Sequence, residues 1–135
     1  MFGKILLAVD ESDHSVKATE LTGEVASQFN SEVVVLHVHE ALPTRGGPVD
    51  IRVAEAEAAD TAATKLSQQG VSARAEEARA YHGLVANRIV GTGEKNGVDL
   101  IVMGSRGLSD IAGMFLGSVT HKVLHLAECP VLIAR

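Results

Sequence analysis

The segment GSRGLSDIAGMFLGSV, residues 104–119, has the residue types and spacing of a phosphate-binding loop. Gly104 and Gly107 permit a sharp backbone turn and a close approach to a ligand, and Gly117 precedes a predicted helix. Backbone N–H groups at a helix start bind anions because they lack intrahelical partners and lie at the positive end of the helix dipole. Ser118 adds a hydroxyl group there. Glycines at a helix start also occur as plain turns, so this segment alone leaves both interpretations open.

Hydrophobic, β-branched runs alternate with helical patterns along the chain, which is typical of βαβ units around a parallel sheet. The predicted strands cover residues 4–9, 32–39, 71–79, 99–103 and 131–134. The first two runs are continuously apolar, which predicts strands that are buried on both faces. The charges in 71–79 place that strand at an edge of the sheet.

Four helices are predicted between these strands. One starts at Ser12 or Asp13, an Ala-rich one stops at Gly70, and the others cover 84–96 and 117–127. Their expected core-facing residues are Ala18, Leu21, Val25 and Phe29 in the first, Ala56, Ala59, Ala63 and Leu66 in the second, and Val119, Val123 and Leu126 in the last. Gly91 and Gly93 predict a kink or frayed turn in the third helix.

Residues 41–50 are dense in Gly and Pro and are predicted to be the longest irregular connection. They leave the carboxyl end of the second strand, where ligands bind in open doubly wound sheets. We therefore expect this segment to act as a lid. Asp10 follows the first strand and Gly104 ends the fourth, so both face the same crevice if these strands are neighbours.

Length and composition narrow the class of protein. The chain has 135 residues, of which 46% are hydrophobic, and we expect one globular domain over residues 1–135. A net charge of -5 without a basic stripe argues against nucleic-acid binding. Residues 1–9 are too short to span a membrane and lack signal-peptide features, so a cytoplasmic protein with no membrane partner is expected. The single Cys129 is interpreted as a small buried apolar group.

The spacing Gly104-x2-Gly107-x9-Gly117-Ser118 resembles the nucleotide-binding pattern of the ATP-binding branch of the universal stress protein family. The resemblance extends over the whole chain, through ILLAVDES (5–12), VVVLHV (33–38), DLIVMGSRG (99–107) and CPVLIAR (129–135). It implies a single Rossmann-like domain of the adenine nucleotide α-hydrolase type. This α/β fold has a five-stranded parallel sheet in the order 3-2-1-4-5 with four helices on both faces. It further implies ATP in the crevice and a homodimer.

The resemblance also assigns residues to the ligand. Those implied around the nucleotide are Ala8, Val9, Asp10, Val38, Met103, Gly104, Ser105, Arg106, Gly107, Gly117, Ser118 and Val119. The expected ligand is ATP, with ADP or AMP as alternatives, together with Mg²⁺ that Asp10 supports through the phosphates. The alternative role for Asp10 is to cap the following helix. Glu11 departs from the small residue common in the family and adds negative charge near the phosphates.

Three functions fit this pattern: a regulatory protein that holds a nucleotide and signals to an unidentified protein partner, a slow ATP hydrolase or nucleotidyl-transferring enzyme, and a purely structural domain. Phosphoryl transfer needs a positioned base or charge stabilisation. The segment GTGEKNG at 91–97 lacks the Gly-Lys-Ser/Thr of a Walker sequence. At most slow ATP hydrolysis is therefore expected, with no catalytic residues.

Two histidine pairs have spacings compatible with metal binding. His37 and His39 share one strand face, but no third ligand lies nearby in the sequence, which favours packed histidines. His121 and His125 share a helix face without the HExxH pattern and are interpreted as solvent-facing. Lys122 is interpreted as a surface residue. For Arg106, contact with phosphate and simple exposure to solvent are equally favoured.

The last predicted strand, VLIA at 131–134, has no charge and lies at a sheet edge. An uncharged edge strand is a template for pairing with another chain. The symmetric solution is a homodimer in which two copies of this strand pair across a two-fold axis.

Overall fold

A parallel sheet forms the centre of the computed structural model, which describes residues 1–42, 49–50, 57–107, 113 and 115–135. Its five parallel strands are β1 (Lys4–Ala8), β2 (Glu32–Leu42), β4 (Ser72–Tyr81), β5 (Leu100–Gly104) and β6 (Val131–Ala134). Their spatial order is β4-β2-β1-β5-β6. Numbered among the parallel strands alone, this is the predicted order 3-2-1-4-5, and the charged strand β4 lies at an edge as expected.

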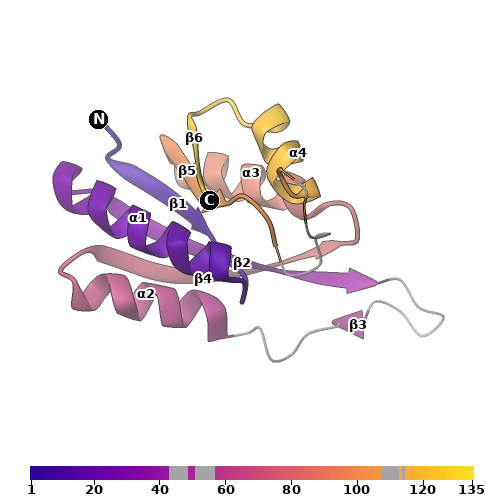
Figure 1. Ribbon diagram of the computed structural model, residues 1–135, viewed down its shortest axis with the longest axis horizontal. Coiled ribbons are helices and arrows are strands. Elements are labelled where there is room, and N and C mark those ends of the chain that lie inside the picture. Colours follow the sequence, from indigo (N-terminus) through magenta and orange to yellow (C-terminus); the bar gives the residue numbers. More distant parts are fainter. Residues whose placement is uncertain (43–48, 51–56, 108–112, 114) are drawn as a thin grey trace.

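Two helices cover each face of the sheet (Figure 1). They are α1 (Asp13–Phe29), α2 (Ala58–Gln68), α3 (Val85–Asn96) and α4 (Ser118–Leu126). Alternating residues of β1 serve the two layers: Ile5 and Leu7 pack with α1 and α2, while Leu6 packs with α3 and α4. All three are fully buried, which explains why this strand is continuously apolar. No helix in the described part of the chain is long and apolar enough to cross a membrane.

The predicted face of helix α1 is correct at Ala18, which is fully buried, and partly correct at Leu21 and Val25, which pack against the same core cluster. Leu21 and Val25 are only half-buried, and Phe29 is exposed, with its ring edge-on to Phe2. The buried residues are small: Ser15, Ala18, Thr19, Thr22, Gly23 and Ala26. Small side chains let the helix lie close to the sheet. The hydroxyls of Thr19 and Thr22 donate to carbonyls one turn earlier, so burying them leaves no donor unsatisfied.

The predicted faces of the other helices are largely correct. Ala59, Ala63 and Leu66 are buried in α2, whereas Ala56 lies outside the described residues. In α4, Val123 is fully buried, and Val119 and Leu126 pack half-buried against the same hydrophobic cluster.

The sequence predicted an irregular connection over residues 41–50, but part of this segment is regular in the structure. β2 continues through Leu42, and β3 (Val49–Asp50) pairs with it antiparallel, Ala41 opposite Asp50. The ten-pair ladder with β4 carries β2 this far beyond the end of β1. Residues 43–48 lie outside the described part of the structure, so the lid stays a prediction.

Helix α3 is continuous from Val85 to Asn96, contrary to the kink predicted at Gly91 and Gly93. At Gly93 an added Cβ would lie 3.1 Å from Val98 Cγ2, so a larger residue there requires the side chain of Val98 to shift. Gly91 faces open space, so nothing there requires glycine. The helix ends at Gly97, whose φ of 66° is left-handed and favours glycine.

These conformations predict opposite effects for two substitutions in the same region. Gly91→Ala should raise the free energy of unfolding by up to about 1 kcal/mol, because alanine has the higher helix propensity. Gly97→Ala should lower it by about 1–2 kcal/mol, because a Cβ is unfavourable at positive φ. Urea unfolding followed by circular dichroism measures both, and effects of equal sign would contradict this account of α3.

Candidate functional site

Most of the predicted ligand residues lie at the edge formed by the carboxyl ends of the strands. Ala8 at the end of β1 pairs with Leu36 of β2 on one side and with Met103 of β5 on the other. Val38 follows two residues after Leu36 along β2, and Gly104 ends β5 opposite Ala134 of β6. The expectation that Asp10 and Gly104 follow neighbouring strands is therefore confirmed.

Asp10 organises the turn between β1 and α1. Its Oδ1 accepts hydrogen bonds from the N–H of Ser12 and the hydroxyl of Ser15, both at 2.8 Å. Its own N–H donates to Ser15 Oγ at 2.8 Å. The helix N-cap is Ser12, whose side chain accepts from the N–H of Ser15. Asp10 thus has a structural role beside α1, but the capping role weighed for it belongs to Ser12.

Ser105 joins three elements just after β5. Its N–H donates to the carbonyl of Ala134 in β6 at 2.8 Å, and its carbonyl accepts from the N–H of Gly117 at 2.6 Å. Its hydroxyl lies 3.3 Å from Nδ1 of His14 in the first turn of α1. The side chain is buried, so this junction is shielded from solvent. It fixes the start of α4 beside the ends of β5 and β6.

Packing by itself requires glycine at position 104. A Cβ built on it would lie 2.6 Å from Cβ of His14 and 2.9 Å from the backbone carbon of His14. The first turn of α1 therefore occupies the space that a side chain at position 104 would need, and the predicted approach of a ligand to this backbone stays a prediction. The carbonyl of Gly104 accepts from the hydroxyl of Thr120 at 2.8 Å, which adds a second link to α4.

Helix α4 begins without a capping side chain. Its N-cap is Gly117, which is buried, extended (φ -68°, ψ 161°) and unable to cap because it has no side chain. Ser118 at the first helical position is exposed, and Val119 is half-buried. Arg106 and Gly107 are half-buried at the other end of the loop. Residues 108–112 and 114 lie outside the described residues.

Lys122, His121 and His125 of α4 were also considered as ligand residues from the sequence. The ammonium group of Lys122 donates to the carbonyl of Gly83 at 2.9 Å, which ties α4 to the turn before α3. His121 and His125 are both exposed, as predicted.

Cys129 is only half-buried, so its predicted full burial is wrong. Burial nevertheless raises the pKa of its thiol, and the negative charges of Asp99 and Glu94 act in the same direction. The thiol is consequently protonated near neutral pH, which does not suit a nucleophile or a metal ligand.

Glu77, which was not predicted as a site residue, lies beside His37 and His39. The parallel register sets His37 directly opposite Glu77, and Oε2 of Glu77 lies 2.5 Å from Nε2 of His39. The strand 71–79 was predicted, but its register against β2 was not. Only that register shows that the two histidines have a third neighbour.

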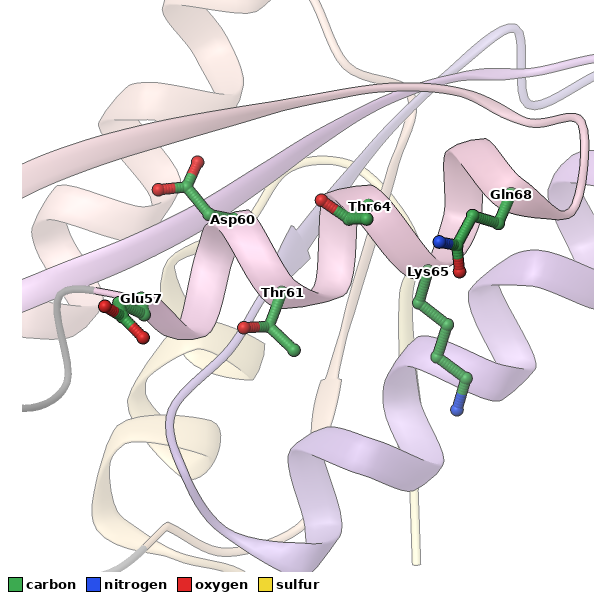
Figure 2. A pocket seen from close by; sticks show the side chains of 6 residues that line it. All are labelled: Glu57, Asp60, Thr61, Thr64, Lys65 and Gln68. Carbon is green, nitrogen blue, oxygen red and sulfur yellow. The ribbon is translucent and has the colours of Figure 1, made fainter.

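A surface pocket of about 560 Å³ lies along α2 (Figure 2). It is lined by Glu57, Asp60, Thr61, Thr64, Lys65 and Gln68. Lys65 reaches toward α1, where it lies 3.5 Å from Oε1 of Glu20. The pocket shares no residue with the edge described above, and its mixture of charges defines no ligand.

Strand order, helix layers and the junction at Ser105 define an open α/β fold with a candidate site at its carboxyl edge. The model of the universal stress protein family matches residues 1–135. The universal stress protein YxiE of Bacillus subtilis is 37% identical, with full coverage of both chains. The chain therefore belongs to the universal stress protein family.

Solved structures agree with this fold. A universal stress protein from Archaeoglobus fulgidus superposes with a TM-score of 0.78 at 24% identity, with complete coverage of both chains. Another universal stress protein was solved in complex with cAMP. It superposes with a TM-score of 0.70 at 25% identity, over 99% of this chain and 97% of that one.

The close approach at Gly104 predicts a stability effect. Gly104→Ala should lower the free energy of unfolding by about 1–3 kcal/mol, because the contact with the backbone of His14 can be relieved only by moving α1. Urea unfolding measures the change, with Gly91→Ala as the control in open space. A Gly104→Ala protein as stable as the wild type would contradict the packing role.

Proposed function

We propose that this chain is an ATP-binding regulatory protein of the cytoplasm that acts as a homodimer. The nucleotide lies at the carboxyl edge between β1, β2 and β5, with its phosphates at the start of α4. The observation that carries this proposal is the Ser105–Gly117 hydrogen bond, which holds a helix start without a capping side chain beside the strand ends. A relative of the same fold in complex with cAMP supports an adenine nucleotide as the ligand.

The phosphates are assigned to the first turn of α4. Its backbone N–H groups lie at the positive end of the helix dipole, and anions bind there. Gly117 is the N-cap, and its N–H donates to the carbonyl of Ser105, so the phosphates are assigned to the N–H groups of Ser118 and Val119 in the turn that follows. Gly107 and Arg106 extend the phosphate contacts from the loop. Gly104 and Ser105 support the site from beneath through their contacts with α1, β6 and α4.

The adenosine part is assigned to the strand ends. Ala8, Val9 and Asp10 follow one another at the end of β1, with Met103 beside Ala8 and Val38 further along β2. Val38 supplies an apolar contact, and the backbone groups of Val38 and Met103 read the polar edge of the base. Asp10 accepts from a ribose hydroxyl or supports Mg²⁺ that arrives with the phosphates.

Regulation is favoured over catalysis. Lys122 is tied to the carbonyl of Gly83, so it is not held at the phosphates. No Walker lysine or catalytic base has been assigned to the edge, and slow hydrolysis is the most that we assign to the site. The functional output is then a change of conformation or stability that a protein partner detects when ATP binds.

Substitution of Gly117 tests the phosphate assignment. Gly117→Asp should lower ATP affinity at least about tenfold, equivalent to about 1.4 kcal/mol, because a carboxylate competes with phosphate at the helix start. The helix should still form, because Asp is a favoured N-cap residue. Calorimetry with ATP, with and without Mg²⁺, measures the affinity and the contribution of the metal.

Gly117→Asn is the matched control, because Asn has nearly the same size and also caps helices but carries no charge. It should bind ATP more tightly than Gly117→Asp. If both variants bind ATP with wild-type affinity, the assignment of the phosphates to this helix start is wrong. If the wild-type protein binds no adenine nucleotide, the proposed function is wrong.

The homodimer is assigned to the outer edge of β6. Val131, Leu132 and Ile133 are half-exposed, and within the described residues β6 pairs only with β5. Phe115, at 69% exposure, and Leu124, at 42%, add apolar surface near the carboxyl-terminal end of the chain. Pairing of two β6 strands would cover this edge.

Sedimentation at falling protein concentration tests the dimer. The wild type should sediment as a dimer, and Val131→Lys should raise its dissociation constant at least about tenfold, because a charged side chain is placed in an otherwise apolar interface strand. Ala80→Lys on the opposite edge strand β4 is the control and should leave the dimer intact. A wild type that is monomeric at every concentration excludes the interface.

A further inference from the structure

The strands β2 and β4 bring two imidazoles and a carboxylate together. Glu77 Oε2 lies 2.5 Å from Nε2 of His39 and 3.4 Å from Nδ1 of His37. The two imidazole rings are edge-to-face, with centroids 4.5 Å apart. One ligand atom from each of the three side chains lies within 4.8 Å of the others. The carboxylate oxygen is thus close to both rings at once.

The backbone holds this cluster rigidly. His37 and His39 are alternate residues of β2, and Glu77 is the register partner of His37 in a ladder that continues to Tyr81. His37 is 2% exposed, His39 16% and Glu77 38%, so the cluster is closed on the inner side and accessible from the outer side. A metal ion can reach it without any unfolding of the sheet.

The cluster lies on the opposite face of β2 from Val38, one of the residues assigned to the nucleotide. Val33 and Val35 of β2 pack in the cluster that contains α1 and α2, and His37 and His39 continue that alternation. Val38 packs on the opposite face, with α3 and α4. The histidines therefore lie on the other side of β2 from the proposed contact with adenine.

We propose that His37, His39 and Glu77 form a binding site for Zn²⁺. Two imidazoles and one carboxylate are a ligand set that zinc takes in proteins, with its fourth position open to water or substrate. In tetrahedral coordination two ligand atoms lie about 3.3 Å apart, given zinc–ligand distances of about 2.0–2.1 Å. The 3.4 Å between His37 and Glu77 already fits. The shorter contact to His39 opens by a small rotation of the half-exposed Glu77.

Nearby charges set limits on affinity. Arg79 is the register partner of His39, and its positive charge opposes a divalent cation. Glu77 is the one carboxylate in the cluster, so the site with zinc carries a net positive charge. We therefore expect moderate affinity, with zinc exchanging rather than permanently bound.

A second histidine–carboxylate contact in the same region provides a control. His82 contacts Glu40, and no second imidazole accompanies this pair in the described residues. If a single histidine–glutamate pair were enough for zinc, His82→Gln would affect binding as much as changes in the cluster. The proposal requires that it does not.

The experiment is a titration of the metal-free, full-length chain with ZnCl₂ in the absence of nucleotide, followed by calorimetry, and with Co²⁺ as a spectroscopic probe. The background carries His121→Gln, so that the exposed histidine pair of α4 cannot bind the metal. One equivalent of Zn²⁺ should bind, and the melting temperature should rise with zinc concentration. His39→Gln and Glu77→Gln should each lower the affinity at least about tenfold, because each removes a direct ligand.

Two results would overturn the proposal: no zinc binding by the His121→Gln background, or equal affinity in that background, His39→Gln and Glu77→Gln. Both substituted side chains are partly exposed, and circular dichroism verifies that the variants fold. His82→Gln should keep the affinity of the background, and a tenfold loss there would count against the cluster. Since no nucleotide is present, the result does not depend on whether the chain binds ATP.

Discussion

The hydrogen bonds of Ser105 are the constraint on which the candidate site depends. Through its N–H, carbonyl and hydroxyl this residue contacts β6, the start of α4 and the first turn of α1. Elements far apart in the sequence thereby converge at a single buried position. A parallel sheet sends every strand to the same edge, but it does not by itself position a helix start there. Ser105 supplies that placement, and Thr120 reinforces it from α4.

Gly104 and Gly117 belong to the same motif, but each is glycine for a different physical reason. Gly104 is needed because α1 lies against it, which is a requirement of the fold. Gly117 leaves the helix start without a capping side chain, which suits a ligand rather than the stability of the helix. A motif that reads as one functional unit therefore combines a packing residue, Gly104, with Gly117, for which we propose a role in binding. Loss of function after a change at Gly104 would not by itself identify a ligand contact.

Element boundaries and the edge position of β4 were largely predictable, because apolar runs, charges and turn residues are properties of single segments, whereas the strand order came from the family resemblance. The burial of Ser15 and Thr22 in α1 was not predictable, and neither was the exposure of Phe29, because close packing on the sheet favours small side chains there. The contact between His37 and Glu77 was also not predictable, because the two residues lie 40 positions apart in the sequence and only the register of β2 against β4 brings them together. The candidate ligand residues came from the family resemblance, and the structure adds which of them lie together.

The two margins of the sheet differ in chemistry. β4 carries Arg74, Glu76, Glu77 and Arg79 along its length, whereas β6 carries only apolar side chains. Charged margins resist the addition of further strands, and apolar margins accept them. If two chains pair through β6, the apolar edge strand of each chain is buried in the interface, and the charged edge strand β4 stays exposed at the outside of the combined sheet. Assembly along the sheet then stops after one step, so the same asymmetry that permits pairing also prevents growth into a fibre.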